Sequence, residues 1–563
     1  MSTYPKIDTG VKRKAGLDYK TGRGYHRAVL SPLRTLLTAP PSPDPVAKVG
    51  IGGWLLCAVV FLAAALALSS VQFSKPNLVG ADAYYHVRVA QIIAEEGIPD
   101  EFPYTQASVF KEHYADKQFL FHVLLIPFLG EDLILGPKIL TVLLTALLFA
   151  LMAWVLLRNG VPLPWLWTFL MLASGVMFLF RMSLTRPHLL AVPLSVLAAH
   201  LMLRRHVLGT FLVSMLFPLC YTAAHLLPGM ALVYAAACVL RKEPFPWRLI
   251  LAAFAGVLLG LLLHPHRFNI FSLWYLQNVQ VLLNVWRIPD EVGMGNEFFS
   301  VPGRIILIDA FIPLLGAFAV AFFFLLRGTR ASLRTVFLFL LSTAFFVLFL
   351  NIGRFVEYWV PFTILLLASG ARDLTEGTNW REWLRRHRIG GPALCGLLTL
   401  LLLAQTARSV VESQLEVETD RSLYYRYEAT WISKHVPAGE VVFTCNWDSF
   451  PYLFFFAPKQ RYLVALDPTF MQAYDPDLFR VWYRIATGQP DDSADLVLSR
   501  FNSRWVFAEK REWILPCIER ARRDPRFLLV CNGPDAAIFA VMPDPLPVAR
   551  AVLFSLMARE LGA

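Results

Sequence analysis

The sequence lacks several features that would assign it to other classes of protein. It has no internal repeat of the kind that builds a solenoid, and no inverted symmetry between its halves that would argue for a transporter. Charged residues make up only 17% of the chain, whereas apolar residues make up 56%. The mean hydropathy is +0.52. Repeated apolar runs separated by short basic clusters therefore predict a membrane protein with several spans.

Cysteine is also scarce, with seven residues among 563. Four of them lie inside apolar runs, at Cys57, Cys220, Cys238 and Cys395. Packing is the simplest role of a cysteine in such a run. The other three, Cys445, Cys517 and Cys531, lie towards the C-terminus. A disulfide between Cys517 and Cys531 would require this part to be extracytoplasmic, and spacing alone does not establish the pair.

The distribution of charge predicts an orientation in the membrane. The net charge of +11 does not indicate nucleic-acid binding, because basic residues gather in the short gaps between apolar runs, as in cytoplasmic loops. Residues 1–50 carry nine Lys or Arg against three Asp or Glu, so we expect a cytoplasmic basic arm without a cleavable signal peptide. The segment 72–136 carries four Lys or Arg against nine Asp or Glu. We therefore expect it to be a large outer loop.

Apolar segments define a predicted transmembrane domain over residues 51–406. Eleven spans fit an N-terminus inside: 51–71, 139–157, 161–180, 189–203, 207–224, 226–240, 248–263, 305–326, 335–350, 355–370 and 391–406. An odd number places residues 407–563 outside. There, short apolar runs such as 441–444 and 462–466 alternate with helical patterns. This predicts a small extracytoplasmic α/β domain with a mostly parallel sheet.

Unusual polar residues gather at the predicted outer face. Asp82 and His86 lie four residues apart just beyond the first span, Arg186 and His188 form part of the second outer turn, and Arg354 lies at the outer end of the tenth span. Arginine suits phosphate because its guanidinium is always charged and donates two parallel hydrogen bonds. A facing carboxylate can hold a divalent cation or act as a base. The pattern predicts a site for an outer-leaflet lipid phosphate. We expect His86 to lie near the acceptor, which is the molecule that would react with this lipid.

Structural alternatives exist for the same residues. Arg354 and Glu357 are three residues apart on one predicted helix and could pair with each other. Arg186 could extend to lipid head groups. His122 and His225, near helix ends, are explained equally well as interfacial residues.

The layout and two motifs resemble a known family, the C-type (GT-C fold) glycosyltransferases that use polyprenyl-phosphate-linked sugars. The likeness is greatest to the catalytic subunits of bacterial and archaeal oligosaccharyltransferases. Their signature Trp-Trp-Asp-Tyr-Gly follows a strand in the tail, and here Asn446-Trp447-Asp448-Ser449-Phe450 follows a predicted strand. The segment 461–469 is similar to the family's strand that ends in an Asp and a Thr.

The resemblance implies an enzyme that transfers a sugar or oligosaccharide from a polyprenyl (pyro)phosphate to a protein, lipid or glycan acceptor. The reaction would take place at the extracytoplasmic face of the inner (plasma) membrane. Asp82 and Glu297 would be the catalytic carboxylates, and Arg354 would contact the donor phosphate. Trp447 and Asp448 would belong to the acceptor pocket.

Arg186 and His188 would join Arg354 at the donor phosphate. A divalent cation, Mg or Mn, would be held by Asp82, Glu297 and His188. The second outer turn, which runs from Arg181 to His188, has no acidic pair like that of the family. Two alternatives follow: the protein uses no metal, or His188 replaces a carboxylate ligand.

Only Trp447 and Asp448 remain of the five-residue signature, which leaves the acceptor open. One alternative is a C-type transferase that moves a single sugar onto lipid or glycan. A lipid or glycan transporter or flippase is another, and a non-catalytic assembly or sensor protein is a third.

Overall fold

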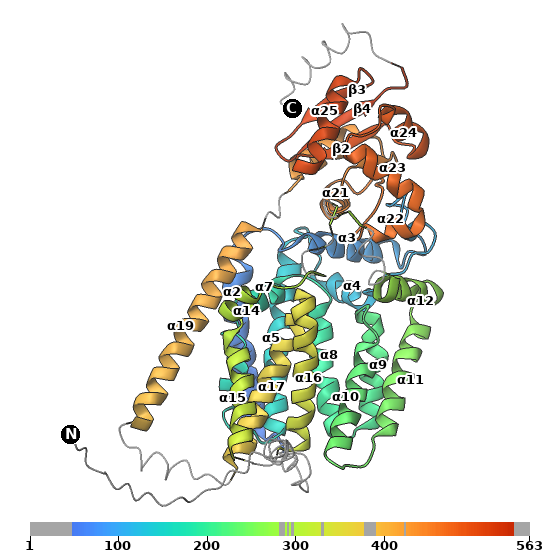
Figure 1. Ribbon diagram of the computed structural model, residues 1–563. Helices are drawn as coiled ribbons and strands as arrows, with labels where there is room; N and C mark the ends of the chain where they lie inside the picture. Colours follow the sequence, from blue (N-terminus) through green and yellow to red (C-terminus); the bar gives the residue numbers. More distant parts are fainter. Residues whose placement is uncertain are drawn as a thin grey trace, which may run out of the picture.

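The computed structural model describes residues 48–280, 288–289, 292–293, 295, 298–327, 331–376, 390–420 and 424–544. It consists of a long helical bundle with a small sheet-containing domain at one end (Figure 1). We call the end of the bundle that meets this C-terminal domain the domain-facing end. Glu297, one of the predicted catalytic residues, lies outside the described residues.

The bundle is built from apolar helices of very different lengths. They are α2 (Ile51–Gln72), α5 (Leu135–Arg158), α6 (Pro164–Phe169), α7 (Val176–Ser183), α8 (His188–Leu203), α9 (Val207–Cys220), α10 (Leu226–Leu240), α11 (Trp247–Leu263), α14 (Gly303–Asp309), α15 (Phe311–Arg327), α16 (Leu333–Asn351), α17 (Val356–Thr375) and α19 (Gly390–Thr419). Every predicted span contains helix. Over the described ranges, four helices (α2, α5, α16 and α19) are long and apolar enough to cross a membrane, or up to six if α7–α8 and α14–α15 are each one bent span. The structure agrees with a helical membrane protein, and the number eleven stays a prediction.

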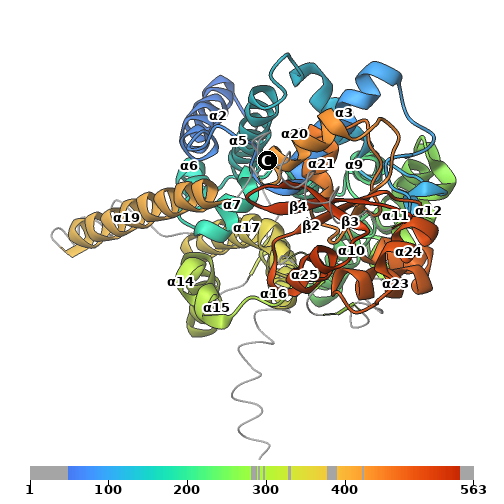
Figure 2. The same cartoon turned by 90° about the horizontal axis from the view of Figure 1, so that it is seen from above.

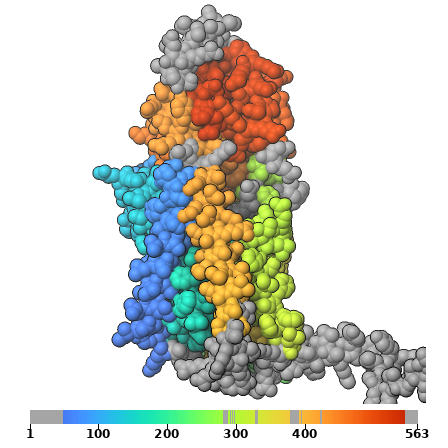
Figure 3. Space-filling view, turned by 90° about the vertical axis from the view of Figure 1, so that its left-hand side faces the viewer, coloured from blue at the N-terminus to red at the C-terminus, as the bar shows by residue number. Residues whose placement is uncertain are grey.

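Helix α19 continues to Thr419, beyond the predicted end of the membrane domain at residue 406. Figure 3 shows it as an orange column between α2 (blue) and α15 (yellow-green), and Figure 2 shows it reaching outward from the bundle. The Gln414 side-chain amide donates to the Ser70 carbonyl at 2.9 Å, and Arg408 lies 3.9 Å from Asp309 at the bend between α14 and α15. Its leucines are largely exposed, which suits a surface that faces lipid.

Short helices cover the domain-facing end: α3 (Ala81–Glu96), η1 (Val109–Lys111), α4 (Phe119–Leu125), η2 (Ile126–Phe128), α12 (Arg267–Tyr275), η3 (Leu276–Gln280) and η6 (Gly353–Phe355). The chain turns into α3 at Gly80, whose φ of 79° favours glycine. A Cβ at this position would lie 2.8 Å from the Leu184 side chain. The Gly80 N–H donates to the Asp420 carboxylate at 2.9 Å. This turn lays α3 across the bundle end and places Asp82 in its first turn (Figure 1).

The C-terminal domain contains α20 (Arg426–His435), β1 (Val442–Thr444), α21 (Phe450–Phe456), α22 (Thr469–Tyr474), α23 (Pro476–Ala486), α24 (Ser493–Arg500), β2 (Trp505–Glu509), η7 (Glu512–Ile514), α25 (Leu515–Arg523), β3 (Phe527–Asn532) and β4 (Ala536–Val541). The sheet order is β1-β2-β4-β3. Only β1 and β2 are parallel, whereas β2–β4 and β3–β4 are antiparallel. The prediction of a mostly parallel sheet was therefore wrong. The link from β3 to β4 is too short for the crossover that a parallel pair needs.

The predicted strand at 462–466 is not one of the four strands, although Arg461 just before it accepts from the Val442 N–H of β1 at 2.8 Å. The segment itself joins the first loop. The Tyr462 N–H donates to the Tyr104 carbonyl at 2.7 Å, and the Ala107 N–H donates to the Leu463 carbonyl at 2.8 Å. The ring of Tyr84 on α3 also packs against Tyr452 on α21, with centroids 5.1 Å apart. The first loop and the C-terminal domain thus share one core, which fixes the domain over the bundle.

The Cys517–Cys531 disulfide, which the sequence left open, is not formed, and all seven cysteines are free. Helix α25 directs Cys517 towards the end of β1, where its sulfur lies 3.8 Å from that of Cys445. Both side chains are buried. The third cysteine of this domain, Cys531, is on β3.

Glu509 at the end of β2 makes the stability of this domain depend on pH. Its side chain is fully buried, and burial raises its pKa from the ordinary 4.5 to about 8, although Arg511 nearby lowers it. The unfolded chain releases this proton at lower pH than the folded one, so stability falls as pH rises from about 4.5 to about 8. We expect Glu509→Gln to raise the unfolding temperature at pH 8 and to have a much smaller effect near pH 5.

Thermal unfolding of the purified protein across this pH range measures the effect. The matched control is Glu512→Gln, because the side chain of Glu512 is exposed. Equal unfolding temperatures for Glu509→Gln and wild type at every pH would contradict a buried, neutral Glu509.

Candidate active site

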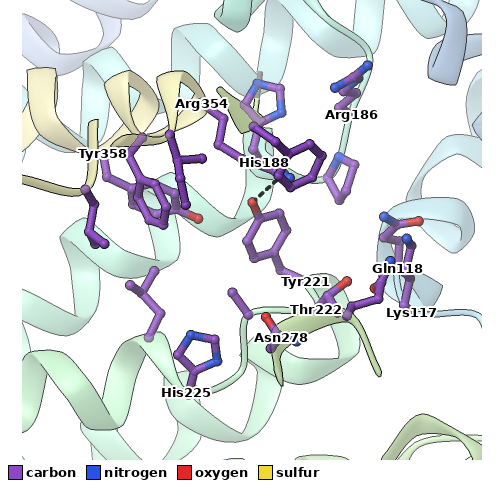
Figure 4. Close-up of a pocket in the computed structure, with 18 of the residues that line it drawn as sticks. Lys117, Gln118, Arg186, His188, Tyr221, Thr222, His225, Asn278, Arg354 and Tyr358 are labelled. Carbon is purple, nitrogen blue, oxygen red and sulfur yellow. Dashed lines mark hydrogen bonds between the residues drawn. The ribbon is translucent and has the colours of Figure 1, made fainter. Parts of the chain in front are cut away.

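A cavity of about 590 Å³ lies at the domain-facing end of the bundle. Its walls come from the bundle, from the first loop and from the C-terminal domain. Apolar side chains of α10 and α16 line its deeper part: Leu226, Met230, Val233, Leu341, Phe345 and Leu348. The charged and polar lining side chains, several of which Figure 4 labels, belong to the rest of the cavity wall. The cavity therefore combines an apolar half with a strongly polar half.

Most of the predicted site residues meet here. Those that line the cavity are Asp82, His86, Arg186, His188, Arg354 and Trp447. They come from four separate parts of the chain, and the fold alone brings them together. Their position agrees with a common site, while their individual roles stay predictions.

Asp82 and Arg186 form an ion pair across the cavity wall. An Nη of Arg186 lies 3.1 Å from the Asp82 carboxylate, and the two side chains are 16% and 36% exposed. Asp82 comes from the first turn of α3, and Arg186 from the turn between α7 and α8, where the two helices bend by 112°. A partly exposed pair of this kind contributes little to stability. An incoming anion can therefore replace the carboxylate on Arg186 at low cost.

Arg354 in η6 is held by aromatic side chains. It donates to the Tyr221 hydroxyl at 2.9 Å (Figure 4), and its guanidinium carbon lies 5.2 Å from the ring centre of Phe298. Glu357, which the sequence suggested as a partner of Arg354, bonds a different arginine. Buried Glu357 accepts from the Nε of Arg181 at 2.6 Å, because the first turn of α17 directs Glu357 towards α7.

His188 is buried at the start of α8. Its Nε2 lies 2.8 Å from the Arg181 carbonyl, and since a carbonyl only accepts, Nε2 carries the proton. The nitrogen left for a ligand is Nδ1. A metal would have to use this atom.

The described residues do not make a metal site by themselves. They contain no group of three or more His, Cys, Asp or Glu that could hold a metal ion. Asp82 is paired with Arg186, and Glu297, the third ligand of the predicted set, is outside the described ranges. The divalent cation stays a prediction.

The sequence prediction missed Lys117, which precedes α4 and lines the cavity. Burial lowers the pKa of Lys117 to about 8, although Asp467 and Asp82 nearby raise it. Figure 4 shows Lys117 and Gln118 across the cavity from Arg354. Lys117 belongs to a polar loop without periodicity, so no pattern in the sequence marked it.

Asp467 from the C-terminal domain also lines the cavity. It accepts hydrogen bonds from the backbone N–H and hydroxyl of Thr469 at 2.8 and 2.5 Å. Burial raises its pKa. In the sequence it was noted only as the Asp of the segment that resembles the family. The polar half thus presents Lys117, Arg186 and Arg354 together with the carboxylates Asp82 and Asp467.

Trp447 and Asp448 are adjacent in sequence but have different surroundings, because only Trp447 lines the cavity. Trp447 lines the cavity, and its indole N–H donates to the Val292 carbonyl at 3.1 Å. Asp448 is not among the lining residues. It accepts a hydrogen bond from Arg511 at 2.7 Å, and burial raises its pKa. In this structure Asp448 therefore orients Arg511.

No protein-family model and no curated protein matches the sequence. Solved structures do share the fold. AglB oligosaccharyltransferase from Archaeoglobus fulgidus, in complex with an inhibitory peptide and a dolichol-phosphate, matches with a TM-score of 0.61 and 12% identity over 88% of this chain and 75% of that chain. The oligosaccharyltransferase of the same organism in its apo form has a TM-score of 0.59, 13% identity and coverage of 87% and 75%.

ArnT from Cupriavidus metallidurans in its apo state has a TM-score of 0.50 and 15% identity, over 86% of this chain and 97% of that chain. These neighbours are polyprenyl-phosphate-dependent glycosyltransferases of the GT-C fold. The predicted resemblance to the GT-C fold is confirmed. At such low identity, donor, acceptor and chemistry have to be argued from the site.

Proposed function

We propose that this protein is a membrane glycosyltransferase that moves a sugar or oligosaccharide from a polyprenyl (pyro)phosphate to an acceptor at the extracytoplasmic face. One observation carries the proposal. A single cavity holds the cations Lys117, Arg186 and Arg354, the carboxylates Asp82 and Asp467, and a separate apolar half. This combination suits a ligand that is anionic at one point and hydrocarbon beyond it.

The three cations would bind the donor phosphate and stabilise it as the leaving group. During transfer the bond between the anomeric carbon and the phosphate oxygen breaks, and the electron pair stays on the phosphate. Preorganised cations in a site with little water are effective at this task. Arg354 is already oriented by Tyr221 and Phe298, so little reorganisation is needed.

Asp82 would act on the acceptor once the donor is in place. When a phosphate oxygen takes the position of the carboxylate on Arg186, Asp82 is released from its ion pair. A released carboxylate can accept the proton of the attacking hydroxyl or amide. This order links acceptor activation to donor binding.

The apolar half would receive the first isoprene units of the lipid. Leu341, Phe345 and Leu348 of α16 face Leu226, Met230 and Val233 of α10 across it. Hydrocarbon in such a cavity is stabilised by about 25 cal/mol for each Å² removed from water. Lipid-linked donors are therefore favoured over free sugar phosphates.

The predicted Mg or Mn ion is a separate proposal, and no step above depends on it. If Glu297 completes a site with Asp82 and the Nδ1 atom of His188, a chelator should abolish transfer and added Mg or Mn should restore it. Transfer that is insensitive to chelator would remove the metal from the proposal.

Purified protein in lipid vesicles, supplied with a radiolabelled pool of native lipid-linked sugars, tests the function. Lys117→Met should reduce transfer by roughly 10²-fold, because one phosphate cation is lost. Lys111→Met, which changes an exposed residue of the same loop, should leave transfer unchanged.

A single-sugar polyprenyl phosphate, compared with an oligosaccharide pyrophosphate, distinguishes the two donor classes. Labelled lipid that crosses the membrane without forming a new linkage would support the flippase alternative instead.

A further inference from the structure

A buried chain of hydrogen bonds runs from Asp116 to His86 at the cavity wall. The Asp116 carboxylate lies 2.7 Å from Nδ1 of His122, and Nε2 of His122 lies 2.8 Å from Nδ1 of His86. All three side chains are buried, at 1%, 0% and 2% exposure for Asp116, His122 and His86. The mechanism proposed above uses none of these three residues.

The carboxylate sets the direction of every bond in this chain. An ionised carboxylate only accepts, so Nδ1 of His122 carries a proton, and Nε2 of the neutral imidazole then accepts. Nδ1 of His86 then donates, and Nε2 of His86 keeps a lone pair. Although burial raises the pKa of Asp116, the contacts with His122, the Gln118 N–H and His264 outweigh it and leave that pKa below the ordinary value. Lys117 is also close enough to attract the charge of Asp116.

The ring nitrogens of the neighbouring His264 and His266 all have hydrogen-bond partners. Nε2 of His264 lies 3.0 Å from the Asp116 carbonyl, and its Nδ1 accepts from the His266 N–H at 3.1 Å. Nδ1 of His266 accepts from the Asp116 N–H at 3.3 Å, and its Nε2 lies 2.7 Å from the Pro99 carbonyl. Within the described part of the chain, Nε2 of His86 has no such partner, and His86 lines the cavity.

His86 therefore presents this nitrogen beside Asp82. The two residues are one helical turn apart on α3 and share a face of it. Burial first, and then the neighbouring His122 and the cations Arg186 and Lys117, lower the pKa of His86 well below its ordinary value. His86 therefore remains neutral at physiological pH.

We propose that the Asp116–His122 pair fixes the tautomer of His86, so that Nε2 of His86 accepts a hydrogen bond from a second O–H or N–H of the sugar acceptor, beside the nucleophile whose proton goes to Asp82. This inference rests on the proposed transfer reaction and deepens it. His86 orients the acceptor through this second hydrogen, while the phosphate, which offers only acceptor oxygens, is excluded from this position. His122 and Asp116 are positioning residues, since they act through His86.

The variant Asp116→Asn reverses the chain without removing it. The Gln118 N–H donates to Oδ1 of Asp116 at 3.1 Å, which keeps the amide oxygen of Asn on that side. The amide NH₂ then faces His122 and donates to its Nδ1. His122 in turn donates from Nε2, and His86 must accept at Nδ1 and carry its proton at Nε2. The cavity would then meet a donor where the wild type offers an acceptor.

The experiment is ¹⁵N NMR of the full-length protein labelled at histidine, combined with transfer kinetics. His86→Ala identifies the His86 signals by their loss. In the wild type, Nε2 of His86 should have the shift of an unprotonated nitrogen, and in Asp116→Asn that of a protonated one. We expect Asp116→Asn to lower kcat by roughly 10²-fold, and to add nothing in the His86→Ala background. Asp132→Asn, an exposed change in the same loop, should match the wild type.

A protonated Nε2 of His86 in the wild type overturns the inference, and this readout needs no variant to fold. Full additivity of Asp116→Asn and His86→Ala also overturns it, because it would indicate a structural role for Asp116. A wild type that transfers no sugar from any lipid-linked donor refutes the proposed function itself. The two failures are therefore distinguishable.

Discussion

Replacing Arg354 with Ala should reduce transfer from a lipid-linked donor by roughly 10²- to 10³-fold, the range found when one preorganised charge-stabilising group is removed. Arg354 lies where the leaving phosphate would develop charge, and its hydrogen bond to Tyr221 and the face of Phe298 hold it in place before the donor arrives. The loss should fall mainly on kcat, because charge develops in the transition state. Radiolabelled transfer in vesicles, with kcat and KM separated, measures it.

Two further variants make this result specific. Arg354→Lys keeps the charge but loses the two-pronged geometry, so it should restore only part of the activity. Arg408→Ala, a half-exposed arginine on α19 outside the cavity, should transfer like the wild type. If Arg354→Ala retained full activity with normal expression, the phosphate would not bind at this end of the cavity.

The second large effect is expected for Asp82→Asn. A general base contributes typically 10²- to 10⁴-fold, and an amide can neither accept the proton nor balance the charge of Arg186. We expect transfer to fall by about that factor while donor binding stays the same or tightens, because Arg186 loses its resident carboxylate. Transfer kinetics and donor binding to the purified variant measure the two effects separately.

Asp132→Asn, which changes an exposed carboxylate of the same loop, is the matched control for Asp82→Asn. The variant Arg186→Gln tests whether Asp82 serves only to hold that arginine. If it does, the double variant should be no worse than either single one. An Asp82→Asn protein that transfers normally would leave Asp82 a structural partner of Arg186.

Membrane character, the helical segments and a good part of the site were predictable from the sequence. Hydropathy determines which segments avoid water. These segments form helices because every backbone group in the membrane must find its hydrogen bond inside the protein. Arg186 and Arg354 stood out because charges at membrane depth are costly. Asp82 stood out by its position just after a span. All three line the cavity.

Other features depended on which surfaces met in three dimensions. The sheet is mixed because β3 and β4 form a hairpin, and the run at 462–466 pairs with the first loop instead of the sheet. Hydrophobic patterning identifies extended segments but not their partners, since pairing is decided by neighbours far away in sequence. For the same reason, the sequence left the pairing of Cys517 open.

The site also combines features that the sequence predicts with features that only the tertiary structure decides. Glu357 is three residues from Arg354 but bonds Arg181, 176 residues away. Lys117 and Asp467 approach the same cavity from the first loop and the C-terminal domain, and His86 is linked to His122 and Asp116. The sequence by itself determined which residues are charged, apolar or able to donate a proton. Only the tertiary structure decided which of them share a low-dielectric cavity, because direction and distance set the strength of each electrostatic contact.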